Sequence, residues 1–200
     1  CRGMLAKLAH GDAAAGGRYT LALEASDASR QTEVNSLRFG SGRFNTTYRL
    51  GADDRQRRAR ASLAGAWTLA RAWMQDLEAQ LYWQGTDIRQ DSEQYRLPDR
   101  ATPFESLRWR RFDYAADAAG ISLLAQARHE GARARHWHVY GLDLASTRYE
   151  GLRDGLETNL RTGQTSTTIL GEQLPVRDFP TTDADSAALF WQDEIGLGER

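Results

Sequence analysis

Apolar and polar side chains alternate along much of this chain. Residues 76–89 give the clearest example, because leucine, alanine and tryptophan take one set of alternate positions, and glutamate, glutamine and tyrosine take the other. Residues 18–27 follow the same rule, with Tyr19, Leu21 and Leu23 separated by threonine and alanine. Successive side chains of a β-strand point to opposite faces of its sheet, so a period of two predicts strands with one apolar and one polar face.

About seven such strands are expected, joined by connections of alternating length. The strands are expected at residues 4–9, 18–27, 57–69, 76–89, 107–127, 135–148 and 186–197. The short connections are 10–17, 70–75 and 128–134, and the long ones are 28–56, 90–106 and 149–183. Outer-membrane β-barrels have this asymmetry, with tight turns on one side and long loops on the other. We therefore expect an all-β fold, an antiparallel transmembrane β-barrel segment, and the odd strand number indicates part of a larger barrel.

Composition agrees with a β-rich chain but does not decide between a membrane barrel and a soluble β-sandwich. Hydrophobic residues make up 40% of the chain and charged residues 26%, and the mean hydropathy of −0.63 is too low for membrane helices. The aromatic content fits a barrel wall and fits a soluble β-sandwich binding module equally well. The formal net charge is −1, with both signs interspersed, so no basic face for nucleic acid is expected.

Several stretches resemble the barrel region of TonB-dependent outer-membrane receptors of the heme type, the hemoglobin/transferrin/lactoferrin receptor family. The closest likeness is in the stretches 140–144 (YGLDL), 147–155 (TRYEGLRDG), 175–180 (PVRDFP) and 190–195 (FWQDEI). A looser likeness is in the stretches 4–7 (MLAK), 81–84 (LYWQ) and 110–114 (RRFDY). The resemblance covers nearly the whole chain and is most specific from Tyr140 onward.

The resemblance implies a plugged barrel of 22 strands in the outer membrane of a Gram-negative bacterium. Residues 1–200 would be part of the barrel domain, and the plug that contacts the TonB complex is absent from the sequence. The implied partners are heme or a hemoglobin-type ligand, the TonB complex and outer-membrane lipid. Heme would be the transported ligand rather than a permanent cofactor. The Phe-Arg-Ala-Pro and Asn-Pro-Asn-Leu motifs that flank the family's heme-binding histidine do not occur here, so no heme ligand is carried over to this chain. Siderophore receptors share the architecture, and a siderophore receptor is therefore the alternative.

Candidate ligand contacts fall in or beside the longest expected connection. Tyr149 carries a phenol that can bind ferric heme iron. Arginines pair with carboxylates such as heme propionates, and the candidates are Arg148, Arg153, Arg161 and Arg177. Two alternatives stand beside this interpretation. Tyr149 also suits a membrane interface, and the arginines also suit a salt-bridged loop with its acidic residues, Asp154, Glu157, Glu172 and Asp178.

The histidines and the acidic residues suggest no catalytic centre. His136 and His138 are two apart and would share the outward face of Tyr140, near a short turn, where amphipathic rings line a membrane interface; metal or heme ligation by the pair is the alternative. His10 and His129 are expected in short turns. No nucleophile elbow or metalloprotease motif occurs, so we do not expect an enzyme. The remaining candidate groups are expected to line the wet inner wall of the barrel, namely Glu24, Glu78, Gln80, Gln84 and Glu194.

Overall fold

The computed structural model describes residues 1–12, 16–131, 134–177 and 179–197. The long strands are β1 (Arg2–Asp12), β2 (Gly17–Glu33), β3 (Thr47–Arg71), β4 (Met74–Arg96), β5 (Ser106–Glu130), β6 (Ala134–Asn159) and β10 (Thr182–Leu197). The minor elements are the 3-10 helices η1 (Asn35–Leu37) and η2 (Gly42–Phe44) and the strands β7 (Thr165–Ser166), β8 (Thr168–Ile169) and β9 (Glu172–Gln173). Residues 13–15 of the first expected turn, and Asp178 of the expected acidic set, lie outside the described residues.

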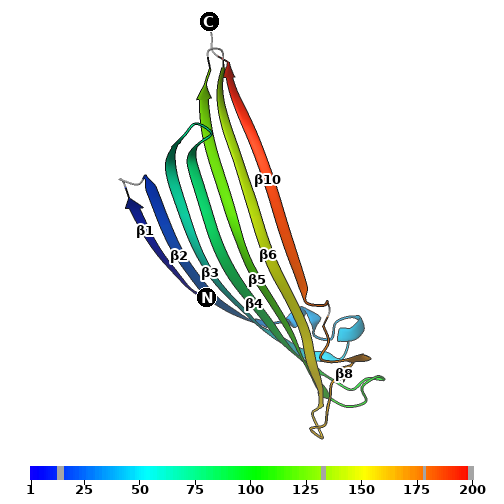
Figure 1. Ribbon diagram of the computed structural model, residues 1–200. Coiled ribbons are helices and arrows are strands. Elements are labelled where there is room, and N and C mark those ends of the chain that lie inside the picture. The colour runs from blue at the N-terminus through cyan, green and yellow to red at the C-terminus, as the bar shows by residue number, and fades with distance from the viewer. Residues whose placement is uncertain (13–15, 132–133, 178, 198–200) are drawn as a thin grey trace.

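The seven long strands form one antiparallel sheet in chain order, β1-β2-β3-β4-β5-β6-β10. Figure 1 shows them side by side as a single curved layer, with the short connections at one end and the long connections at the other. The all-β antiparallel fold, the seven strands and the alternating connections are thus confirmed. Among the described residues, no helix has both the length and the apolar character needed to cross a membrane.

Strand register gathers the apolar side chains on one face, which we call the apolar face. One row of paired residues crosses all seven strands: Leu8, Leu21, Leu63, Leu81, Ile121, Leu144 and Ala187. The opposite face, the polar face, carries the alternate residues, including the expected inner-wall residues Glu24, Glu78, Gln80, Gln84 and Glu194. The central leucines of the row lie uncovered, Leu63 being 50% exposed and Leu81 52% exposed.

The sheet has almost no enclosed core. Among the described residues, the buried hydrophobic side chains are Ala125, Ala127, Ile169 and Leu174. A soluble β-sandwich needs a second long sheet packed about 10 Å from the first, and the described residues form only the two-stranded β8-β9 sheet beside the large one. The sandwich that composition left open is therefore not formed.

Aromatic residues border the apolar face towards the short connections. Trp67 Nε1 donates a hydrogen bond to the Tyr19 hydroxyl at 3.0 Å, and their ring centroids are 5.7 Å apart. The Tyr140 hydroxyl donates to the carbonyl of Trp73, and Trp191 lies opposite Tyr140. Such girdles of amphipathic rings are typical where a barrel wall leaves the hydrocarbon layer.

The strands are longer than the sequence pattern predicted. The expected long connections 28–56, 90–106 and 149–183 shrink to 34–46, 97–105 and 160–181, because β2, β3, β4 and β6 continue through much of them. At the opposite end, His10 and His129 lie in β1 and β5 rather than in turns. Strand pairing persists in these extensions although both faces are polar there. On the apolar-face side, cross-strand ion pairs such as Arg55–Asp27 at 2.6 Å replace apolar contacts.

Candidate functional site

The three long connections pack onto the polar face at the long-loop end of the sheet. In the connection 160–181, Leu174 and Ile169 lie over Gly155 of β6, where an added Cβ would meet Leu174 Cδ1 at 2.7 Å. The ring of Phe179 covers Gly151 equally closely, at 2.7 Å from such a Cβ. Glycine at these two positions therefore allows the connection to approach the strand backbone.

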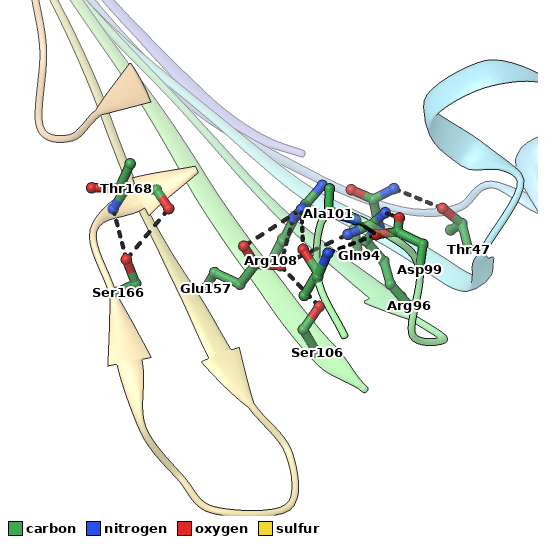
Figure 2. A network of polar contacts seen from close by, with 11 residues as sticks. Thr47, Gln94, Arg96, Asp99, Ala101, Ser106, Arg108, Glu157, Ser166 and Thr168 are labelled. Atoms are coloured by element: carbon green, nitrogen blue, oxygen red, sulfur yellow. Dashed lines mark hydrogen bonds and ion pairs between the residues drawn. The ribbon is translucent and has the colours of Figure 1, made fainter. Parts of the chain in front are cut away.

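Glu157 is the centre of a buried polar network that joins β5 and β6 to the connection 97–105 (Figure 2). Arg108 Nε and Ser106 Oγ both donate to Glu157 Oε1, at 2.8 Å and 2.9 Å. Arg108 Nη2 also donates to Thr102 Oγ1 at 3.2 Å, which ties the connection to the sheet. Arg96 Nη1 lies 3.8 Å from Glu157 Oε1. Removing one partner of such a buried pair leaves an uncompensated charge and typically costs about 3–5 kcal/mol.

Asp99 folds the connection 97–105 back onto this network. Its carboxylate accepts hydrogen bonds from the backbone N–H groups of Thr102, at 2.7 Å, and Ala101, at 2.9 Å. It also pairs with the buried guanidinium of Arg96. The Thr102 N–H and the Arg96 charge lower the pKa of Asp99 below its ordinary value of 3.8. The network therefore fixes the ends of β4, β5 and β6 and the connection 97–105 relative to one another. We call this region the platform.

Next to the platform, the polar face is hollowed into a groove of about 640 Å³. We call it the arginine groove. Its charged lining consists of five arginines, Arg30, Arg43, Arg110, Arg111 and Arg153, and four acidic residues, Asp54, Asp91, Asp154 and Glu172. Its apolar side chains come from β5 and the connection 160–181: Phe112, Ile169, Leu170 and Leu174. Small-molecule sites commonly measure about 300–1,000 Å³, so the groove has the size and mixed lining of a ligand site.

Positive charge is crowded around Arg110 in the arginine groove. Burial and the neighbouring guanidinium groups of Arg108 and Arg43 lower the pKa of Arg110 from its ordinary value, although an arginine stays protonated in proteins. Within the described ranges, no carboxylate forms an ion pair with Arg110. Arg153, by contrast, pairs with Glu172 at 2.5 Å. The arginines of the lining outnumber its acidic residues by five to four. A bound anion would offset the repulsion at Arg110, so the part of the groove around Arg110 suits a negatively charged group of a ligand.

The structure separates the sequence candidates instead of bringing them into one cluster. Arg148 lies within β6 and not beside a loop; it points to the apolar-face side and pairs with Glu150 at 3.1 Å. Tyr149, expected at the start of a loop, also lies within β6 but on the polar face, where its ring centroid is 6.5 Å from that of Tyr114. The prediction of a common loop for these residues is wrong, because β6 continues to Asn159.

The other candidates lie at three different places along the polar face and the connection 160–181. Arg153 is in the arginine groove. Arg161 is exposed in the turn after β6, where its backbone N–H donates to Asn159 Oδ1 at 2.9 Å. Arg177 Nη1 donates to Thr181 Oγ1 at 2.8 Å and lines a second hollow of about 470 Å³. Ligand contact by any of them stays a prediction.

Sequence reasoning identified only Arg153 among the five arginines of the arginine groove. Arg30 and Arg110 occupy positions that continue the polar face of β2 and β5, so extending the alternation past the apolar stretch would have identified them. Arg43 comes from the connection 34–46, where no periodic signal exists. Comparison of the chain with protein-family models gave no match, and neither did comparison with curated protein sequences.

Proposed function

We propose that this chain is a stretch of barrel wall from an outer-membrane receptor of Gram-negative bacteria. The observation that carries the proposal is the apolar row from Leu8 to Ala187, which crosses every long strand and is covered by nothing in the described residues. Exposed apolar surface of this extent destabilises a protein in water but is stabilised by lipid. The polar face would then line the lumen, and the long connections would face the outside.

The two edges of the sheet support a larger closed assembly. Among the described residues, β1 pairs with β2 alone and β10 pairs with β6 alone. Unpaired strand edges are rare in stable proteins because they template aggregation, and further strands that close a barrel remove them. On the family resemblance, the complete protein would be a 22-stranded barrel with a plug, driven by the TonB complex.

The arginine groove supports an anionic ligand with a flat apolar part. Heme combines two propionate carboxylates with a large planar ring, which matches guanidinium groups beside Phe112, Leu170 and Leu174. We therefore propose heme, free or delivered by a hemoglobin-type protein, as the transported ligand. Uptake would need only binding and gated release, without a covalent step and without a resident cofactor.

Heme titration of the intact receptor in detergent tests this proposal. We expect saturable binding that the Arg110→Ala substitution weakens roughly tenfold or more, since a hydrogen bond to a charged group contributes about 1.5–3 kcal/mol. Arg148→Ala is the matched control, because it removes the same charge from the apolar-face side of β6. We expect this control to bind heme as the wild type does.

Two outcomes would overturn parts of the proposal separately. If the intact receptor binds a ferric siderophore but no heme, the siderophore alternative replaces heme and the barrel wall stands. If Arg110→Ala and Arg148→Ala weaken heme binding equally, the arginine groove is not the ligand site.

A further inference from the structure

Three histidines and an aspartate gather at the short-turn end of β5, β6 and β10. His129 lies opposite His136, and His138 lies opposite Asp193. All four side chains belong to the apolar face, which His136 and His138 share with Tyr140, as their spacing predicted. The cluster lies far along the sheet from the arginine groove, so it does not depend on the proposed heme function.

The side-chain atoms of this cluster converge on one point. His136 Nδ1 is 2.9 Å from Asp193 Oδ2, and His138 Nδ1 is 3.4 Å from Asp193 Oδ1. The potential ligand atoms of these three residues all lie within 4.8 Å of one another. The ring of His129 is also close, with its centroid 5.5 Å from that of His138.

Two of the converging atoms lack a hydrogen bond. His138 Nδ1 and Asp193 Oδ1 are both buried from solvent, and neither has a hydrogen-bond partner among the described residues. Leaving a buried polar atom unsatisfied costs about 1–3 kcal/mol. The two atoms face each other at 3.4 Å, within ion-pair distance but without a hydrogen bond, so part of this cost remains.

A divalent metal ion would satisfy both atoms at once. Zn²⁺ binds histidine nitrogen and carboxylate oxygen at about 2.0–2.2 Å in tetrahedral geometry, which separates neighbouring ligand atoms by about 3.3 Å. The 3.4 Å between His138 Nδ1 and Asp193 Oδ1 matches this separation. The 2.9 Å between His136 Nδ1 and Asp193 Oδ2 is a hydrogen-bond distance, so binding of the ion would replace this bond. Imidazole and carboxylate ligands also suit other borderline transition metals more than Ca²⁺ or Mg²⁺.

We propose that His136, His138 and Asp193 form a three-residue binding site for a divalent transition metal of the zinc class, with the fourth coordination position left to water. The local packing fits this role. Trp191 stacks on His138 with ring centroids 6.1 Å apart, which shields one side of the site. The bound ion would link β6 and β10 at the short-turn end.

Zinc binding by the intact, untagged protein in detergent, stripped first with a chelator, tests the site. We expect one tightly bound Zn²⁺ per chain and a rise in thermal unfolding temperature on adding it. The isosteric substitution Asp193→Asn and the substitution His138→Gln should each weaken Zn²⁺ binding at least tenfold and abolish the rise. A Co²⁺-loaded sample should show the visible absorption of tetrahedral coordination in the wild type and lose it in Asp193→Asn and His138→Gln.

His10→Gln is the matched control, because His10 lies on the apolar face of β1 near the same end of the sheet but outside the cluster. It should leave Zn²⁺ affinity unchanged. Circular dichroism establishes that each variant keeps its strands. Zn²⁺ binding that is equal in all variants, or absent from the folded wild type, would refute the site.

Discussion

The short-turn half of the sheet separates apolar from polar side chains, whereas the long-loop half carries charge on both faces. In the first half, Leu63 lies opposite Leu81 on the apolar face, and polar residues take the other face. In the second half, the apolar-face side carries exposed ion pairs such as Arg89–Asp113 at 2.7 Å. The same strands run through both halves, since β3 to β6 each extend well beyond the roughly 9–11 residues that span a bilayer.

This difference means that the two halves of the sheet are stabilised by different interactions. The side chains of the short-turn half enclose almost nothing, so on the proposed function its apolar face would be stabilised by lipid. The long-loop half is stabilised by internal contacts, above all the buried network around Glu157, since exposed pairs such as Arg89–Asp113 contribute only about 0–1 kcal/mol each. Substitutions should therefore act by different mechanisms in the two halves.

Breaking the buried network should have the largest effect. Glu157→Ala removes the acceptor of Arg108 and Ser106 and leaves a buried guanidinium unpaired. We expect a loss of about 3–5 kcal/mol in the free energy of unfolding, measured by denaturant titration of the intact protein in detergent. Glu78→Ala, which removes an exposed polar-face glutamate of the short-turn half, should change it by less than about 0.5 kcal/mol. Equal losses would mean that the two halves are not stabilised differently.

A charge on the apolar face should have the next largest effect. Leu81→Lys places a cation in the middle of the apolar row, where the cost in a bilayer is about 2–4 kcal/mol. Gln80→Lys adds the same charge one residue away on the polar face and should fold nearly as the wild type does. The measurement is the folding free energy in lipid vesicles. If both lysines are tolerated, the apolar face does not contact lipid.

Lowering the pH should have the smallest of the three effects, a loosening of the connection 97–105. Because the folded-state pKa of Asp99 is lowered, its carboxylate stabilises the connection above the ordinary value of 3.8, and this stabilisation is lost as the pH falls through the lowered pKa. Hydrogen exchange of residues 97–105, corrected for intrinsic rates, should rise between about pH 6 and about pH 3. Asp99→Asn should exchange faster at both pH values and lose this dependence. Protection that stays constant in the wild type would contradict the role of Asp99.

Sequence alone predicted the short-turn half well and the long-loop half poorly, for one physical reason. Alternation records a sheet with one apolar and one polar face, and Leu77 to Trp83 display it clearly. Where both faces are polar, Arg55 and Asp91 carry no such record, although backbone pairing continues through them. The arginine groove and the partnership of His138 with Asp193 also depend on register and on the folding of connections, which hydrophobic periodicity does not encode.

The pairing of each long strand only with its neighbours in sequence also bears on how the sheet assembles. β3 and β4 are separated by two residues, so closing that hairpin costs little chain entropy. β10 pairs with β6 across the longer connection 160–181, so closing this loop costs more chain entropy than closing the β3–β4 hairpin. A chain with this topology favours growth hairpin by hairpin from its middle, with no strand inserted between two that have already paired.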